Sequence, residues 1–304
     1  MIEALTCCAD DYGICPERDA GIVEAIDRGI VNAVSVLVNG TSFASAASAS
    51  ESVGRLLPGT SLSRPVQIGL HFNLTEFQPC AASTRPFRGK LPLLAALDDV
   101  DLAEVETELR AQIRRFADLF GGRVPAHVDG HNHVHVFPRI RDVVARVVAE
   151  LGIARIRLPL DRALHDPSID VGALCRQLAR FSAPRDSMPV QGDFNHVVTR
   201  FALDAEAVFR AHQLSFCDAF VGLRLLLHAD TPANARTHLI GELERVLAEP
   251  AVRTVEIMCH PGRRAPESCS AVDAFCKSVS REVELEMLID LRTNPAASIA
   301  KVKR

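Results

Sequence analysis

Short apolar runs alternate with amphipathic segments along this 304-residue chain. Each apolar run is bounded by polar residues, Gly or Pro, a pattern typical of a buried strand. The expected strands are 5–9, 33–38, 66–70, 126–129, 154–158 and 254–259. The intervening segments are therefore the candidates for helices that cover a sheet.

The clearest of these helices is 101–120, in which Val105, Leu109 and Phe116 share one apolar stripe and two glycines end the pattern. The other expected helices are 16–29, 42–57, 138–151 and 231–249. Strands that alternate with helices predict an α/β fold with parallel strands. We expect a (β/α) barrel-like architecture, which includes distorted or incomplete barrels.

The length fits one α/β barrel, and no linker divides the chain, so we expect a single domain over 1–304 with a poorly ordered tail after about 293. A Pro-rich span from about 76 to 92 is too long for a tight turn and is expected to overhang a site. The pattern between 161 and 222 is mixed and predicts no strand count.

Composition narrows the classes of partner. The net charge is -4, the pI is near 6.3, and Lys and Arg are scattered, so nucleic acid is not an expected partner. Nine cysteines without C-x-x-C spacing indicate buried, reduced thiols rather than disulfides or a zinc ribbon. The sequence has neither a signal-peptide pattern nor an apolar run of transmembrane length, so we expect a soluble, cytoplasmic protein.

Potential metal ligands follow the expected strands at several places. Asp10 and Asp11, His71, the segment 129–135 and His260 each come directly after an apolar run. The carboxyl ends of parallel strands gather at one edge, so these side chains are expected to converge. Carboxylate oxygens mixed with imidazole nitrogens suit a divalent ion that keeps a position for water, whereas closed zinc sites more often use thiolates.

Two details remain open from spacing alone. Successive side chains point in different directions on an extended backbone. One of the two adjacent aspartates is therefore expected to bind the metal, while its neighbour contacts the reacting water molecule. Asp129, His131, His133 and His135 line one face if their segment is extended, whereas a helical turn would pair His131 with His135. Spacing does not choose among the three histidines.

Five ordered motifs resemble those of the YdjC-like carbohydrate deacetylases, which include the chito-oligosaccharide deacetylases. The resemblance extends from about residue 5 to 292, and 281–288 is similar to the family's late Arg/Glu/Leu-rich helix. The motifs are Ala-Asp-Asp-Tyr-Gly at 9–13, Leu-Val-Asn-Gly at 37–40, Gly-Leu-His-Phe-Asn-Leu-Thr at 69–75, His-Val-Asp-Gly-His-Asn-His-Val-His-Val-Phe-Pro at 127–138 and Glu-Ile-Met-Cys-His-Pro-Gly at 256–262.

The resemblance implies a barrel-like fold related to polysaccharide deacetylases, and hydrolysis of an N-acetyl group from an amino sugar, oligosaccharide or glycoconjugate. It implies a divalent metal, with magnesium as the family's ion; Zn, Mn, Co and Ni suit the same ligands. It also implies a homodimer. Carried over by position, the metal ligands are Asp11, His71 and His131, the general base is Asp10, the general acid is His260, and the candidates for outer or substrate contacts are Asp129, His133 and His135.

Two rival functions are compatible with parts of this pattern. Asp/His metal sites on barrels also serve phosphoesterases and other amidohydrolases, but the motifs lack the basic residues of a phosphate cradle. A non-catalytic carbohydrate-binding protein would be free to lose the acid or the base, yet Asp10 and His260 are both present. The spans 76–92 and 161–222 are expected to shape the sugar pocket, so the sequence does not name the sugar.

Overall fold

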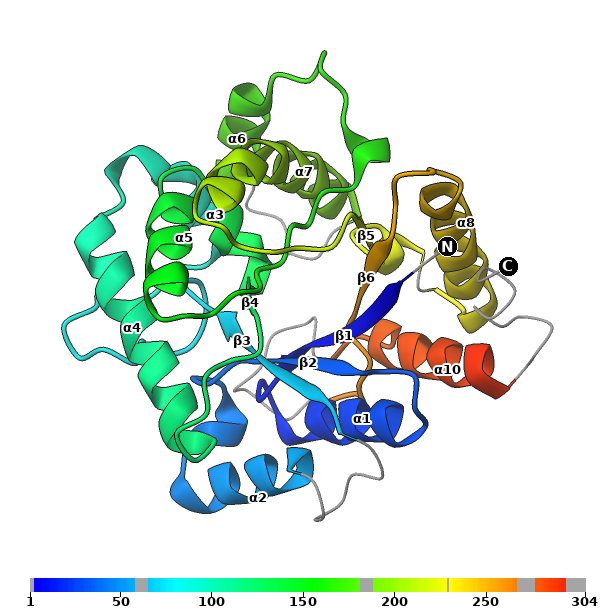
Figure 1. Cartoon of the computed structure of the whole chain (residues 1–304), viewed down its shortest axis with the longest axis horizontal. Coiled ribbons are helices and arrows are strands. Elements are labelled where there is room, and N and C mark those ends of the chain that lie inside the picture. The colour runs from blue at the N-terminus through cyan, green and yellow to red at the C-terminus, as the bar shows by residue number, and fades with distance from the viewer. Residues whose placement is uncertain (1–2, 58–64, 181–187, 229, 267–276, 294–304) are drawn as a thin grey trace. The chain divides into compact units, whose positions relative to one another are not determined.

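The fold is built on parallel strands whose hydrogen-bonded order is β4-β3-β2-β1-β6-β5 (Figure 1). The computed structural model describes residues 3–57, 65–180, 188–228, 230–266 and 277–293. The pairings β1–β2, β1–β6, β3–β4 and β5–β6 are all parallel, which confirms the α/β, barrel-like class. The described strands are β1 (Ala4–Tyr12), β2 (Ala33–Val36), β3 (Gln67–Phe72), β4 (Val128–Gly130), β5 (Ala219–Val221) and β6 (Thr254–Cys259).

The expected helices are present within a few residues of their predicted ends, and local chemistry explains where several begin. Pro16 opens the first helix, where its missing N–H costs nothing, and the side chains of Asp101 and Thr231 cap two others. The helices of the described chain are α1 (Pro16–Asp27), α2 (Ala46–Leu56), α3 (Lys90–Ala95), α4 (Leu102–Leu119), α5 (Ile140–Glu150), α6 (Val171–Ala179), α7 (Met188–Ala211), α8 (Pro232–Leu247) and α10 (Ser280–Thr293).

One expected strand was wrong. The segment 154–158 forms only isolated bridges, from Ile156 to Val128 and from Arg155 to Ser215. The two bridges reach different neighbours, and Pro159 has no N–H to continue a ladder. The span 161–222, for which the sequence predicted no strand count, contains α6, α7 and β5. The tail after about 293, which was predicted to be poorly ordered, lies outside the described residues.

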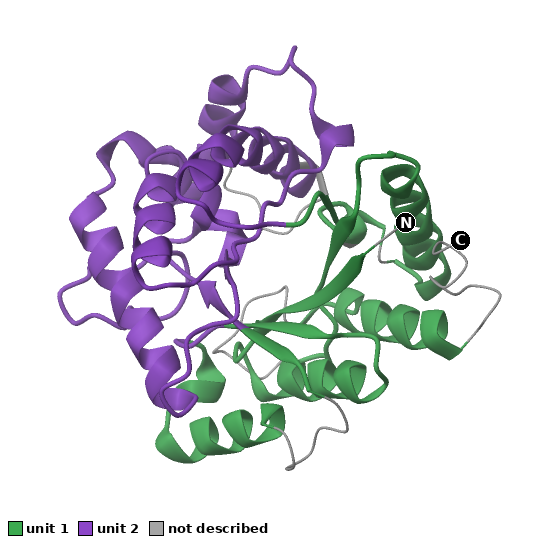
Figure 2. Cartoon of the chain, in the orientation of Figure 1, with its two compact units in different colours: residues 1–36, 40–68, 217–304 green, residues 37–39, 69–216 purple. Residues whose placement is uncertain are grey.

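Contacts between residues divide the chain into two compact units (Figure 2). Unit 1 contains residues 1–36, 40–68 and 217–304, and unit 2 contains 37–39 and 69–216. The prediction of one domain over 1–304 stays a prediction.

Unit 1 is organised around β1, which pairs with β2 on one side and β6 on the other. Helix α10 packs against both α1 and α8. The loop after β6 approaches α1 so closely that α1 requires a glycine there, because a Cβ on Gly21 would lie 2.5 Å from the Cα of Gly262. This contact seats the loop after β6 directly on α1.

Unit 2 combines the β3–β4 pair with helices that pack as α4 on α5, α5 on α7, and α6 on both α3 and α7. The predicted stripe of α4 is buried, and Phe137 packs edge to face with Phe194 and Phe201 in the core. None of the described helices combines the length and the apolar composition that a membrane crossing requires.

Candidate active site

Asp10 and Asp11 lie inside the end of β1, not in the loop after it, because the strand continues to Tyr12. The pairing of β1 with β2 shifts register between Ala9 and Tyr12, and Asp11 has a φ of 68°. A left-handed non-glycine residue costs on the order of 1–3 kcal/mol, and such residues are concentrated at functional sites. The regular alternation assumed for two adjacent aspartates therefore does not apply here.

The first turn of α1 holds this irregular strand end. Arg18 donates from Nη2 to Oδ2 of Asp11 at 3.0 Å, with both side chains buried. The N–H of Gly13 donates to Oδ1 of Asp19 at 2.6 Å, and burial raises the pKa of Asp19 to about 7. The sequence analysis missed both residues, although each is a charged side chain on the buried face of α1, and that is the signal that identifies them.

Asp10 lies in β1 and His260 is the residue after β6, and each follows one member of a paired position on these neighbouring strands. The register of β1 and β6 pairs Ala9 with Cys259, so Asp10 and His260 follow at the same end of the sheet. Both candidates for proton transfer thus belong to unit 1. The parallel pairing of β1 and β6 sets their relative position along the strand direction.

Side chains of helix α10 form hydrogen bonds with both the N–H and the carbonyl of His260. The N–H of His260 donates to Oε2 of Glu284 at 2.6 Å, and Nη1 of Arg281 donates to the His260 carbonyl at 3.3 Å. Arg281 and Glu284 also pair with each other at 2.7 Å, and both side chains are fully buried. The late helix therefore supports the position of the expected acid.

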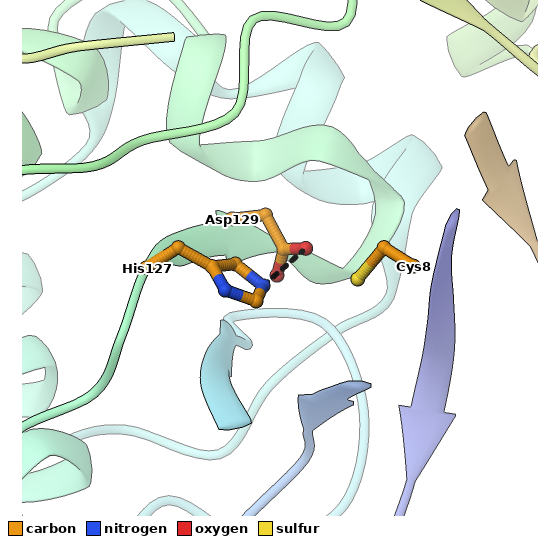
Figure 3. Close-up of side chains that lie close together, drawn as sticks. All are labelled: Cys8, His127 and Asp129. Atoms are coloured by element: carbon orange, nitrogen blue, oxygen red, sulfur yellow. Dashed lines mark ion pairs between the residues drawn. The ribbon is translucent and has the colours of Figure 1, made fainter. Parts of the chain in front are cut away.

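In unit 2, Asp129 is the centre of a buried charge network, and Figure 3 shows its ion pair with His127. Its Oδ1 lies 2.7 Å from Nδ1 of His71, and its Oδ2 lies 2.9 Å from Nη2 of Arg157 and 3.9 Å from Nε2 of His127. Burial alone would raise the pKa of Asp129, but the charges of Arg157 and His71 outweigh it and hold the pKa well below its usual range.

The segment after β4 is neither extended nor regularly helical. Residues His131–Val136 form 3-10 turns, with left-handed Asn132 (φ 51°) and His133 (φ 56°) inside. Both geometries considered from spacing were therefore wrong. The amide of Asn132 donates to Oγ1 of Thr75 at 3.0 Å, which ties this strained turn to the loop after β3.

This kink separates the three histidines. The ring of His131 faces that of His71 edge to face, with 5.3 Å between centroids. His135 is fully buried, its Nε2 lies 3.1 Å from the Arg157 carbonyl, and burial lowers its pKa to about 3. Burial also lowers the pKa of His133 well below its ordinary value. His133 and His135 are thus neutral side chains packed inside unit 2.

Comparison with known proteins decides the family. The family model described as "YdjC-like protein" matches residues 4–296. The chain belongs to the YdjC-like family. It is 36% identical over 296 residues to a carbohydrate deacetylase of Mus musculus, covering 92% of this chain and 86% of the mouse protein.

One further comparison concerns a partial sequence match, and another concerns the fold. A chitooligosaccharide deacetylase of Salmonella schwarzengrund is 38% identical over 159 residues, which covers 51% of this chain and 58% of that protein. A crystal structure from Enterococcus faecalis, of a protein provisionally described as acting in cellobiose-phosphate cleavage, has a TM-score of 0.66 at 19% identity. It covers 99% of this chain and 95% of that one, and at this identity it supports the fold alone.

The donor set of this YdjC-like chain fits a divalent metal. Asp129 is held in its ionised form, so it accepts a hydrogen bond from Nδ1–H of His71 and fixes the orientation of that ring. A carboxylate that orients a histidine in this way is a common arrangement at metal sites. More generally, the described residues include groups of His, Asp and Cys side chains that are close enough together to hold an ion.

Sequence reasoning missed Arg157 and treated His127 as an ordinary histidine. Arg157 is fully buried, and its charge within a segment expected to be a buried strand was the available signal. A buried guanidinium requires a buried anion nearby, and here that anion is Asp129.

Replacing Arg157 by Met is expected to lower the free energy of unfolding at pH 7 by about 3–5 kcal/mol, because the Asp129 carboxylate loses its main counter-charge. Asp129 stabilises the native state above its unfolded pKa of about 3.9, and this contribution declines as pH falls further. Urea unfolding should therefore show the deficit narrowing below about pH 4. Arg162→Met is the control, since its ion pair with Glu206 is exposed and should contribute less than about 1 kcal/mol; an equal loss in both variants would contradict the assignment.

Proposed function

We propose that this protein hydrolyses the N-acetyl group of an amino sugar or oligosaccharide and releases acetate. The observation that carries the proposal is the His71–Asp129–Arg157 network, in which a buried, ionised carboxylate orients an imidazole in a chain of the YdjC-like family. Relatives named carbohydrate deacetylase and chitooligosaccharide deacetylase supply the substrate class.

The metal ligands we propose are Asp11, His71 and His131. Their support is the match to the family's motifs, together with the donor chemistry seen within each unit. A divalent ion bound there would polarise the acetyl carbonyl and lower the pKa of a water molecule. We propose magnesium as the first ion to test, with Zn, Mn, Co and Ni beside it.

The proposed proton transfers use Asp10 and His260. The Asp10 carboxylate takes one proton from the attacking water while the water oxygen bonds to the acetyl carbon. His260 gives a proton to the sugar nitrogen as the carbon–nitrogen bond breaks, so the products are acetate and the free amine. Placement of the two residues at the same level of β1 and β6 supports this division of labour.

Acetate release tests the proposal. The purified protein, loaded with each ion in turn, is expected to release acetate from at least one N-acetylated sugar in a series from the monosaccharide through chitobiose to longer oligomers. Chelation by EDTA should abolish the release, and adding back the ion should restore it. No acetate from any sugar with any ion would overturn the proposal, and release unaffected by chelation would overturn its metal-dependent part.

A further inference from the structure

The loop after β3 is fastened to successive turns of α4. Oε1 of Gln112 accepts from the Asn73 N–H at 3.0 Å, and Nε2 of Gln112 donates to the Asn73 carbonyl at 2.7 Å. One turn nearer the start of α4, the Glu108 carboxylate accepts from the N–H groups of Cys80 and Ala81 at 2.8 and 2.9 Å. Asn73, Glu108 and Gln112 are fully buried, so the first part of the loop belongs to the packed interior of unit 2.

A third turn of α4 holds the next part of the loop. Glu104 accepts from the Arg85 N–H, and its Oε2 accepts from Nε and Nη2 of Arg85 at 2.9 and 2.7 Å. These hydrogen bonds stabilise the charged carboxylate and lower the pKa of Glu104. Glu104 and Gln112 are eight residues apart, so the three attachments extend over about 12 Å of the helix axis. They hold the loop in a defined course against α4.

A cavity of about 300 Å³ lies between this loop, α3 and the first turn of α4, and all of its lining residues belong to unit 2. Its volume is at the lower end of the range for small-ligand sites. The apolar part of its wall consists of Leu74, Pro86, Phe87, Leu93, Val100 and Val105. Leu74 follows His71 by three residues, and three residues of chain reach at most about 11 Å, so the wall begins near the proposed metal ligand.

The charged groups of the lining favour a neutral ligand over an anion. They are two arginines and three carboxylates: Arg85, Arg88, Asp99, Asp101 and Glu104. Arg85 is paired with Glu104, and Asp101 accepts from the first N–H groups of α4. Without an excess of positive charge the cavity does not suit a phosphate group. Arg88 and Asp99 are exposed, and they offer one donor and one acceptor group.

We infer that this cavity binds the sugar unit next to the one that carries the reacting N-acetyl group. A sugar ring has a face of C–H groups and an edge of hydroxyls, which matches the Phe87 ring and the mixed donors and acceptors of the lining. Thr84 also lines the cavity, and its buried Oγ1 has no hydrogen-bond partner among the described residues, so a sugar hydroxyl can supply one. The inference rests on the proposed function, which supplies the oligosaccharide.

The test measures binding of the full chain to N-acetylglucosamine, chitobiose and longer oligomers by calorimetry, in EDTA so that turnover does not interfere. The unmodified protein is expected to bind the oligomers more tightly than the monosaccharide. Phe87→Ala should lower the affinity for oligomers about tenfold and leave the monosaccharide unchanged, because the lost ring contacts the second sugar. Ala96→Trp fills the cavity instead of enlarging it, and it should have the same selective effect.

Phe216→Ala is the matched control, because Phe216 is a half-buried phenylalanine of unit 2 that contacts Phe209 and Arg210 outside the cavity. It should bind every sugar with unchanged affinity. Equal or absent binding of monosaccharide and oligomers by the unmodified protein would overturn the sugar site, and so would a loss in Phe87→Ala that is the same for both. Tighter binding of a phosphorylated monosaccharide than of the oligomers would also overturn it.

The site and the proposed reaction fail in different ways. Oligomer binding that depends on Phe87, without acetate release by the metal-loaded protein, would overturn the reaction and support the sugar site. Acetate release with the same kcat/KM for every chain length, in the unmodified protein and in Phe87→Ala alike, would support the reaction and overturn the site.

Discussion

Asp10→Asn is expected to reduce the rate of acetate release by about 10²–10⁴-fold while leaving metal affinity nearly unchanged. Asparagine has almost the same shape as aspartate, but its amide does not accept the proton of the attacking water. Asp10 is buried at the end of β1, so a change that conserves volume should keep the strand intact. The measurements are kcat, metal content and urea unfolding of the same preparation.

Asp101→Asn controls for the chemical change itself. Asp101 caps α4 by accepting from the N–H groups of Ala103 and Glu104, and asparagine caps helices equally well. Its rate should match that of the unmodified protein. Near-normal turnover in a folded, metal-loaded Asp10→Asn protein would eliminate Asp10 as the base.

His71→Ala is expected to weaken metal binding by more than about 100-fold, which exceeds the 10–100-fold typical of losing an outer partner. The substitution removes the proposed ligand ring, which Asp129 orients through Nδ1. Asp129 keeps Arg157 as its counter-charge, so the variant should remain folded. Metal content after desalting and equilibrium titration with the same ion are the measurements.

His165→Ala is the control for this substitution, because His165 is exposed in a loop of the same unit. It should keep the full metal content. Unchanged stoichiometry and affinity in a folded His71→Ala protein would remove His71 from the ligand set. Loss of metal together with loss of folding would be separated by adding imidazole, which should restore metal binding only to a folded protein that lacks one ring.

The periodicity of the sequence predicted most of the helices and strands, but it wrongly predicted a strand at 154–158. Helix α4 was predicted within a residue or two because its apolar stripe repeats over many turns and it has a capping aspartate. The segment 154–158 has the composition of a strand, yet it forms only isolated bridges. An apolar run reports burial, whereas strand pairing depends on which neighbours reach it, and that information is not local.

Prediction of the site was limited in the same way. The residue types and their order along the chain pointed to Asp10, Asp11, His71 and His260. The backbone at Asp11 and in the turn after β4 was not predictable, because left-handed residues other than glycine leave no signature in periodicity.

The sequence by itself determined the α/β class, the family and the set of candidate ligands, because these follow from local patterns and from the order of motifs. Only the tertiary structure decided that the carboxylate of Asp129 lies beside Nδ1 of His71 and that Arg157 supplies its counter-charge. His71 and Asp129 are 58 positions apart, and Arg157 joins them from a third segment. A protonation state depends on charges and donors that meet through space in a buried environment, and only folding brings them together.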